Sequence, residues 1–375
     1  TQIFTGTGLG LHGSSVGQLG SYGPKGSARL GQGGESVYVN GANGNLVLKQ
    51  SDGFLASAGL GIDIFQIYNS RAEGGSSWRF NTESSLAFEG VANGEGSVVR
   101  RIDEDGHCSR FSYDAVQKRY VAEDGSTARL TCIDGEWQYR EGSSPTSWHY
   151  NGQGQLTRLG DRDGHTLRFN YQNGLLTEIT DTSGKQSVRW SFTQGLLRDV
   201  TWRSEDDTVR HLRYDYDGHE RLSKVSRDLG EGKTYWIAYD YAGDSSRISA
   251  IRQSDGTALH IDYDSEGRVK RLVDGEGRAT SYQYLQGKTI LTNGLGESWT
   301  YFYDPQARLT GIDGPESTHI RYHYEGKYLT AITEGNLHWQ FAYNDAGDCV
   351  RIEEPTGAVT QRGYDEEHRL LFQTR

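Results

Sequence analysis

A repeated unit of about 21 residues constrains the fold of this chain more than any other feature. Each unit carries an anchor aromatic near the end of an alternating stretch such as Tyr-x-Tyr-Asp, and the anchors are Tyr150, Tyr171, Phe192, Tyr216, Tyr241, Tyr263, Tyr284, Tyr303, Tyr324, Tyr343 and Tyr364. The first and last anchors lie 214 residues apart, so the ten intervals average 21.4 residues. A unit this short cannot bury its own apolar face, and neighbouring units must therefore stack on one another.

The composition of the unit predicts a β-hairpin. The aromatic stretch alternates with the strand period of two, and turns rich in Asp, Asn and Gly separate it from an aliphatic stretch. Two strands of typical length and two turns fill the period. We therefore predict an all-β fold in which tandem hairpins stack into a large, curved or spiralling antiparallel sheet. The recurring Asp is predicted to form turns by accepting backbone N–H bonds, and not to act as a catalytic acid.

The aliphatic strand of the unit has an unusual spacing, because its apolar residues lie three apart. The pairs are Leu156/Leu159, Leu176/Ile179, Leu197/Val200, Leu222/Val225, Ile248/Ile251, Val269/Leu272, Leu309/Ile312, Leu329/Ile332 and Cys349/Ile352. Strand alternation places residues three apart on opposite faces. Either the strand has apolar contacts on both faces or it contains a β-bulge, and the sequence does not decide between the two.

Three regions are predicted along the chain. Residues 1–35 form a Gly-rich, irregular N-terminal segment. Residues 36–140 hold irregular alternating stretches, beginning with a hairpin over 36–54. Residues 141–375 hold the array of 21-residue units, which stops part-way through a unit. Because the chain contains no Met, even at position 1, we expect it to be a piece or a processed product of a longer protein.

Composition excludes several classes of function. No apolar run reaches the roughly 18 residues that a membrane-spanning helix needs, so no membrane span is predicted. The net charge of −11 disfavours nucleic acid as a partner, because a phosphate backbone would be repelled. Three scattered cysteines are too few for a disulfide framework or a zinc site. The sequence also contains no recognisable signal peptide and predicts no cofactor.

Motifs that suggest chemistry do not have the context that the chemistry requires. Asp161-x-Asp163 resembles the start of a calcium loop but lacks the later ligands, so turn formation explains it better. His319 and His323 are four residues apart, which on a strand is about 13 Å and too far to share a metal ion. We therefore predict no catalytic, cofactor-binding or metal-binding residue.

The repeat units resemble those of a known family. YDYDGHERLSKV and IDYDSEGRVKRL are similar to the YD repeats of the Rhs family, which also occur in the B and C subunits of insecticidal Tc toxins and in teneurins. GNLVL, IYNSR and SWRFNTESSL are similar to the opening of an Rhs shell, so residues 36–140 would be the opening strands of that shell. The resemblance implies a partial Rhs shell: a spiralling β-sheet that encloses a C-terminal toxin domain.

The resemblance predicts a structural role without enzymatic activity, as a shell portion of a secreted polymorphic toxin whose activity lies in a downstream domain. Expected partners are the toxic cargo, the remaining shell repeats and components of a secretion system or toxin complex, and the expected location is secreted or at the cell surface. One alternative is a carbohydrate-binding or adhesive surface protein, and another is a β-architecture polysaccharide lyase. Glycans would stack on tryptophans, although packing within the sheet is the expected role of Trp78, Trp137, Trp148, Trp190, Trp202, Trp236, Trp299 and Trp339.

The number of units limits what the array can enclose. About 22 strands spaced about 4.8 Å apart give roughly 105 Å of sheet, which closes into a ring about 34 Å across. A compact 100-residue cargo is itself about 33 Å across and would not fit. We therefore expect a partial shell or a cargo that is not compactly folded. The final strand should leave an unpaired sheet edge, which favours self-association.

Overall fold

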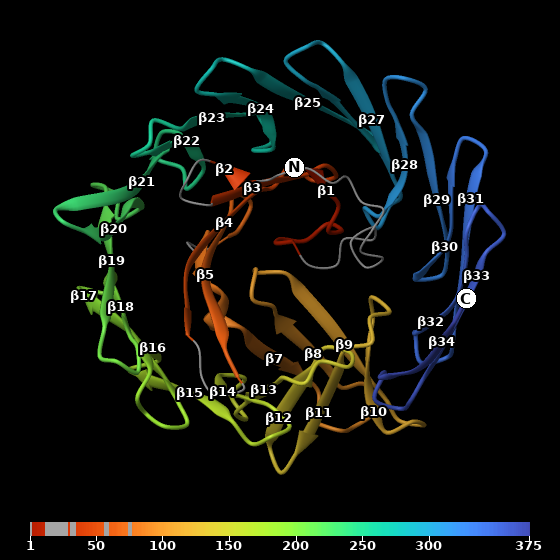
Figure 1. The fold of residues 1–375 in the computed structure, drawn as a ribbon, viewed down its shortest axis with the longest axis horizontal. Coiled ribbons are helices and arrows are strands. Elements are labelled where there is room, and N and C mark those ends of the chain that lie inside the picture. Colours follow the sequence, from red (N-terminus) through yellow and green to blue (C-terminus); the bar gives the residue numbers. More distant parts are fainter. Residues whose placement is uncertain (1, 12–28, 31–34, 56–59, 74–76) are drawn as a thin grey trace.

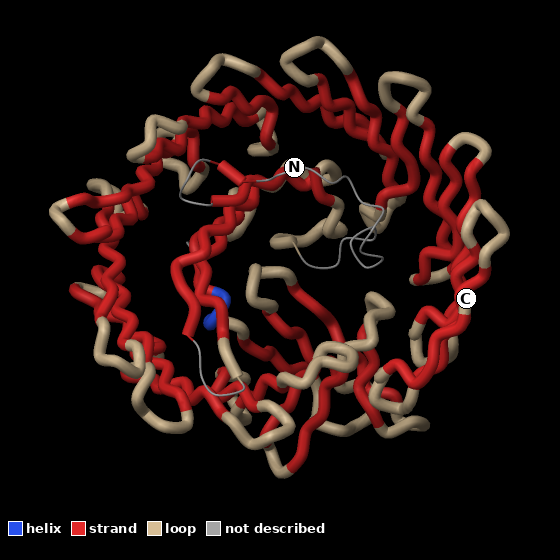
Figure 2. Tube along the Cα trace, in the orientation of Figure 1, coloured by secondary structure: helices blue, strands red, loops and turns tan. Residues whose placement is uncertain are grey.

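The computed structural model describes residues 2–11, 29–30, 35–55, 60–73 and 77–375. Within these residues the fold is almost entirely β, as Figure 2 shows, with three sheets and one short 3-10 helix, η2 (Asn81–Glu83). The all-β prediction is therefore confirmed. No helix in the described part of the chain is long and apolar enough to cross a membrane. Most of the predicted irregular segment 1–35 lies outside the described residues.

Two small sheets come first in the chain. The first sheet has the strand order β1-β3-β4-β5-β6, with β2 also pairing with β3, and its strands are β1 (Gln2–Ile3), β2 (Arg29–Leu30), β3 (Glu35–Asn40), β4 (Leu46–Leu55), β5 (Ile62–Asn69) and β6 (Trp78–Phe80). The hairpin predicted over 36–54 is the antiparallel pair β3–β4. The second sheet has the order β10-β9-β8-β7, with β7 (Ser85–Glu89), β8 (Val98–Ile102), β9 (Cys108–Asp114) and β10 (Arg119–Ala122).

The repeat array forms one continuous sheet of 24 strands, which we call the wall. Each strand pairs with the next one along the chain, and all the pairs are antiparallel. The wall begins at Arg129, before the boundary expected at residue 141. Its strands are β11 (Arg129–Ile133), β12 (Glu136–Arg140), β13 (Ser147–Tyr150), β14 (Leu156–Gly160), β15 (Thr166–Gln172), β16 (Leu175–Asp181), β17 (Ser187–Thr193), β18 (Leu196–Arg203), β19 (Val209–Tyr216), β20 (Leu222–Gly230), β21 (Lys233–Tyr241), β22 (Ile248–Gln253), β23 (Ala258–Tyr263), β24 (Val269–Asp274), β25 (Ala279–Leu285), β26 (Lys288–Thr292), β27 (Ser298–Tyr303), β28 (Leu309–Asp313), β29 (His319–Glu325), β30 (Tyr328–Glu334), β31 (Leu337–Tyr343), β32 (Cys349–Glu353), β33 (Val359–Tyr364) and β34 (Leu370–Thr374).

A β-bulge at the anchor explains the spacing of three in the aliphatic strand. Phe169 pairs with Ile179, but Tyr171 pairs with Leu176, which leaves Thr177 unpaired. Phe169 and Tyr171 are two apart and share a face, so their partners Leu176 and Ile179 also share a face although they are three apart. The register shifts in the same way at Tyr150, Phe192, Tyr216, Tyr241, Tyr263, Tyr303, Tyr324, Tyr343 and Tyr364.

The unit around Tyr284 tests this explanation, because its aliphatic strand has no apolar pair three residues apart. There the pairing of β25 with β26 runs without a register shift, and Tyr284 lies opposite Thr289. Every unit with the spacing of three thus has a bulge, although the last unit, at Tyr364, has a bulge without that spacing. Of the two possibilities left open by the sequence, the bulge is correct.

The wall curves through almost a full circle, and the first two sheets lie within its outline (Figure 1). Arg129 of β11 donates a hydrogen bond to the backbone carbonyl of Glu366, and Arg162 forms a 3.4 Å ion pair with Glu367. The first and last units of the wall therefore lie side by side. Of residues 36–140, expected as opening strands of the shell, the strands up to Ala122 form separate sheets within the outline of the wall, whereas β11 and β12 belong to the wall itself.

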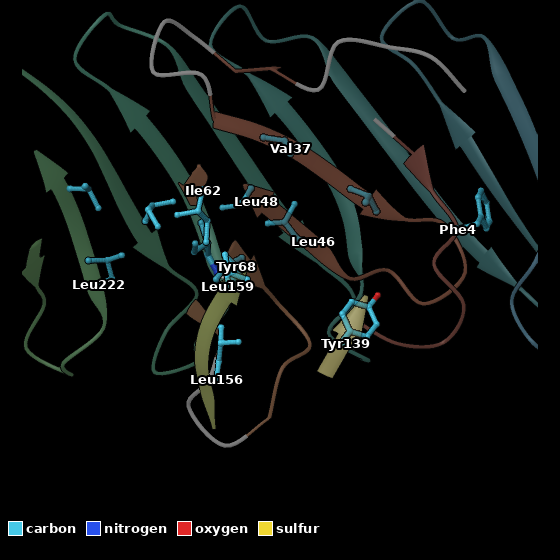
Figure 3. Close-up of a cluster of buried hydrophobic side chains, with 14 of the residues drawn as sticks. Phe4, Val37, Leu46, Leu48, Ile62, Tyr68, Tyr139, Leu156, Leu159 and Leu222 are labelled. Atoms are coloured by element: carbon cyan, nitrogen blue, oxygen red, sulfur yellow. The ribbon is translucent and has the colours of Figure 1, made fainter. Parts of the chain in front are cut away.

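The hydrophobic core lies between the first sheet and the inner face of the wall. Figure 3 shows Val37, Leu48 and Tyr68 of the first sheet in one cluster with Leu159 and Leu222 of the wall. Burial of this apolar surface is the main force that holds the first sheet in place. The wall therefore closes around the chain's own N-terminal part.

Candidate functional site

The predicted anchor tyrosines do not converge on one centre. Seven of the eleven reach back to the preceding unit: the Tyr171 hydroxyl donates to the Leu156 carbonyl (2.7 Å), as Tyr263 does to Ile248 (2.8 Å). Tyr241, Tyr284, Tyr303, Tyr324 and Tyr343 form equivalent bonds. The anchors are thus distributed along the wall, where their hydroxyls join successive units.

In nine of the units the most buried residue of the alternating stretch is not the anchor but the residue two positions before it, which is aromatic in all but one of them. These inner residues are Phe169, Trp190, Tyr214, Tyr239, Ile261, Tyr282, Tyr301, Tyr322 and Phe341, all buried, whereas every anchor after Tyr150 is only partly buried. Sequence reasoning concentrated on the second aromatic of Tyr-x-Tyr and missed the first. The signal was present in the alternation itself, because residues two apart face the same side of a strand.

The inner tyrosines bind the first sheet through polar contacts, and we treat this interface as the candidate functional site. The Tyr239 hydroxyl donates to Glu35 Oε1 (2.8 Å). Gln66 Nε2 donates to the Tyr214 hydroxyl (2.9 Å). Gln2 Nε2 likewise donates to the hydroxyl of Tyr282 (2.6 Å). Polar groups buried at such an interface must be paired, so these bonds fix how the sheet sits against the wall.

Backbone contacts extend this interface to the turns that follow the anchors. The Tyr68 hydroxyl donates to the Ser246 carbonyl (2.8 Å), and the Gly44 carbonyl accepts from the Val269 amide (2.9 Å). Gly44 has a φ of +69°, and a Cβ atom there would collide with Arg268. A glycine is therefore required at this point of close approach.

The second sheet is held to the wall by a fully buried arginine. Arg101 of β8 is 0 % exposed; it pairs with the carboxylates of Asp103 and Glu104, and its Nε donates to the Tyr150 hydroxyl (2.9 Å). Its guanidinium also lies 3.8 Å over the Tyr139 ring. Removing one member of such a buried network leaves an uncompensated charge, which strongly destabilises the fold.

Two acids are buried between the first sheet and the wall. Glu35 is 0 % exposed and Asp52 is 6 % exposed. Burial raises the pKa of Glu35 to about 7, although the bond from Tyr239 lowers it. Burial likewise raises the pKa of Asp52 to about 7, opposed by hydrogen bonds from Gln66 and Tyr214 and by the charge of Arg227. Neither acid was identified by sequence reasoning, because burial depends on contacts between distant parts of the chain.

The recurring acids of the repeat form turns. Asp264 Oδ1 accepts from the amides of Glu266 (2.9 Å) and Arg268 (3.0 Å), while its Oδ2 accepts from Arg268 Nε (2.7 Å). Asp217, Asp304 and Asp365 make the same set of bonds. The prediction that these acids are turn formers is confirmed.

The structure brings the ligand atoms of Asp161, Asp163 and His165 within 4.8 Å of one another. The Asp161 carboxylate is already occupied by the amides of Asp163 and His165 (both 2.9 Å) and by the ring of His165 (2.8 Å). This is the same turn that Asp264 forms, with a histidine in place of the arginine. The cluster is therefore explained by turn geometry.

The tryptophans proposed as glycan platforms pack within the protein. Trp137, Trp190 and Trp202 are buried, while Trp78, Trp148, Trp299 and Trp339 are partly buried against the core. Trp236 is also partly buried, with Lys224 Nζ 5.4 Å from the centre of its ring. A cavity of about 800 Å³ lies between β6 and the wall, but the rings that line it bond internally: Trp78 Nε1 donates to the Tyr241 hydroxyl (3.1 Å). These contacts do not favour the carbohydrate-binding alternative.

Sequence comparison places the units in a known group. The family model of the RHS repeat matches residues 150–186. Probable deoxyribonuclease RhsB of Dickeya dadantii is 24 % identical over 295 residues, covering 69 % of this chain and 18 % of that protein. Teneurin-1 of Caenorhabditis elegans is 26 % identical over 362 residues, covering 92 % of this chain and 12 % of teneurin-1. The chain contains an RHS repeat and is similar to Rhs proteins and teneurins. Its resemblance to the Rhs/YD-repeat family is thus confirmed.

The RHS-repeat chain is short beside its relatives. Probable deoxyribonuclease RhsA of Dickeya dadantii is 25 % identical over 215 residues, which is 56 % of this chain but 13 % of the relative. The chain therefore spans less than a fifth of the length of these proteins. Among solved structures, the TcdB2-TccC3 complex without its hypervariable C-terminal region aligns with 87 % of this chain and 24 % of that chain, with 10 % identity and a TM-score of 0.38.

Proposed function

We propose that this RHS-repeat chain is a shell segment of a longer toxin-like protein that encloses a C-terminal cargo. The observation that carries the proposal is that the wall already encloses polypeptide. Its inner face presents a buried residue from each unit, and the first two sheets pack against that face. A surface built to bury the chain's own strands is suited to hold other polypeptide out of solvent.

The role of the chain in this proposal is mechanical. The 24-stranded wall is held by backbone pairing from β11 to β34 and by the anchor hydroxyls, so it forms a stiff enclosure without any bond-making step. Catalysis belongs to a cargo domain, in keeping with the nuclease names of the bacterial relatives, of which this chain spans only a small part. Its partners are that cargo and further shell repeats, and its location is secreted or at the cell surface.

The space inside the wall limits the size of the cargo that it can enclose. The first two sheets occupy space inside the single turn of wall, and by estimate a ring of this size is already about as narrow as a 100-residue folded domain. Enclosing a cargo as well requires more wall than these 24 strands or a cargo that is not compactly folded. In this proposal the chain is one part of a larger enclosure.

Limited proteolysis of the natural full-length protein tests the proposal. We expect a C-terminal domain beyond residue 375 that is protected from protease within the intact protein and digested when expressed by itself. Equal digestion rates in the two settings, or a gene that encodes no such domain, would refute enclosure. The mechanical role is tested separately by assaying residues 1–375 on DNA, tRNA, peptide and polysaccharide. Reproducible turnover that one side-chain replacement abolishes without loss of fold would refute that role.

A further inference from the structure

We propose that Glu35 and Asp52 form a protonation-controlled latch, through which rising pH loosens the first sheet from the inner face of the wall. The latch is a property of the interface within this chain. It goes beyond the proposed function, because it requires no cargo and no additional repeats.

Glu35 lies where the first sheet meets the wall. It is the first residue of β3 and is 0 % exposed. Its Oε1 accepts the hydroxyl of Tyr239, from the wall strand β21, at 2.8 Å. Its Oε2 has no hydrogen-bond partner among the described residues. A buried carboxyl group with one neutral donor and one unpaired oxygen is far more stable in its protonated form than as a carboxylate.

Asp52 repeats this arrangement on the neighbouring strand β4. Its Oδ2 accepts Gln66 Nε2 of β5 (2.8 Å) and the hydroxyl of Tyr214 of β19 (3.4 Å). Its Oδ1 has no partner in the described part of the chain. Both acids therefore face a neutral tyrosine hydroxyl from the wall, and no described cation pairs directly with either carboxylate.

Arg227 and Asp63 act on Asp52 from the elements packed around it, and the cavity that Asp52 borders is also lined by Arg203, Arg210, His211 and Asp228. Arg227 of β20 is a cation, but its Nη2 donates to the backbone carbonyl of Asp52 (2.8 Å) and not to the carboxylate. Asp63 of β5 is an anion near Asp52, and Glu35 and Asp52 disfavour each other's ionisation. Among the described residues none of these cations forms an ion pair with Glu35 or Asp52, so ionising both buried acids adds charge that no direct partner compensates.

The direction of the pH response follows from this geometry. Burial raises the pKa of both carboxyls to about 7 in the docked state, from 4.5 for Glu35 and 3.8 for Asp52 when solvated. The docked sheet thus binds protons more tightly than the released sheet. Docking is strongest below about pH 4, weakens as pH rises, and has lost this contribution above about pH 7. An enclosure sealed in acid would loosen near neutral pH.

Hydrogen exchange measured by mass spectrometry on the whole chain from pH 5 to pH 8 tests the latch. After correction for the intrinsic exchange rate, we expect the protection of peptides from β3 to β5 to fall at least about tenfold in the wild type. In the double variant Glu35→Gln, Asp52→Asn the fall should be smaller than about twofold. The control variant Glu95→Gln removes an exposed carboxylate from the turn between β7 and β8 and should keep the fall, and peptides from β7 to β10 should respond little in any variant.

Two results would overturn the latch. One is pH-independent protection of β3 to β5 in the wild type, and the other is an equal fall in the double variant. If the double variant does not fold, the wild type decides the question by infrared spectroscopy near pH 6. The latch requires an absorption band of protonated carboxyl groups that disappears as the pH is raised to 8, and absence of that band at pH 6 contradicts it.

Discussion

The hydroxyl of Tyr263 donates a 2.8 Å hydrogen bond to the carbonyl oxygen of Ile248, the residue that opens the aliphatic strand of the preceding unit. Tyr263 pairs with Val269 at a β-bulge, so the bulge and the hydroxyl bond occur at the same residue. A β-bulge bends the strand that carries it, and the Tyr263 side chain links this bulged hairpin to the unit before it.

Replacing Tyr263 should separate these two contributions. Tyr263→Phe loses one hydrogen bond and should destabilise the wall by about 1 kcal/mol. Tyr263→Ala also removes a partly buried ring and should cost about 3 kcal/mol, the lower end of the range for large aromatics. Denaturant unfolding measures both values. Hydrogen exchange should show lost protection mainly in units 241–303, because repeat arrays couple nearest neighbours. Tyr303→Phe is the matched control, since its hydroxyl bond is longer (3.1 Å) and exposed.

Arg101 should be among the most sensitive positions for stability. Arg101→Met leaves the buried carboxylate of Asp103 without its cation and should cost about 3–5 kcal/mol. Its neighbour Arg100 pairs with Glu89 on the surface, where both side chains are nearly half exposed, so Arg100→Met should cost less than about 1 kcal/mol. Thermal unfolding compares the two variants directly. Equal losses at the two positions would show that the buried network does not hold the second sheet to the wall.

The turn acids should tolerate asparagine but not alanine. Asp264→Ala removes both amide contacts of the turn and should cost about 1–2 kcal/mol. Asp264→Asn keeps an acceptor for those amides and should cost less than about 1 kcal/mol, because Asn344 makes the same two bonds in a later unit. Chemical denaturation of the two variants checks this order, and a variant Asp264→Asn as unstable as Asp264→Ala would contradict it.

Asp264 should also make the stability of the fold depend on pH in acid. Partial burial alone would raise the pKa of Asp264, but hydrogen bonds from the Arg268 amide and guanidinium and from the Glu266 amide lower it overall. A lowered pKa means that the contribution to stability is present above the unfolded pKa near 4 and is lost as the pH falls below it. As the pH falls below about 4, the wild type should therefore lose stability more steeply than Asp264→Asn, as measured by unfolding at each pH.

The last strand of the wall should promote association. Strand β34 pairs with β33 on one side, and its other edge has no partner among the described strands. Leu371 and Phe372 are 66 % and 55 % exposed there. Exposed apolar edges pair with other chains, so light scattering should show association that rises with concentration and is reduced by Leu371→Lys. Leu295→Lys alters an even more exposed leucine (86 %) in a turn and should have little effect.

Much of the wall could be predicted from the sequence because its contacts are local. Strands that pair are adjacent in the chain, so the period, the alternation and the turn residues specify each hairpin without reference to the rest of the fold. The spacing of Leu176 and Ile179 was compatible either with a bulge or with apolar contacts on two faces. Only the pairing of Tyr171 with Leu176 in the structure identifies the bulge.

The candidate site could not be predicted in this way. Glu35 lies 204 positions from Tyr239 and Gln66 lies 148 positions from Tyr214, and no sequence period links the members of either pair. The sequence alone determined the repeat, the hairpins and the turns, because short-range backbone preferences and alternation control them. Only the tertiary structure decided that the wall closes on the chain's own first strands. That closure depends on the curvature accumulated over 24 strands, and it alone buries the two acids Glu35 and Asp52.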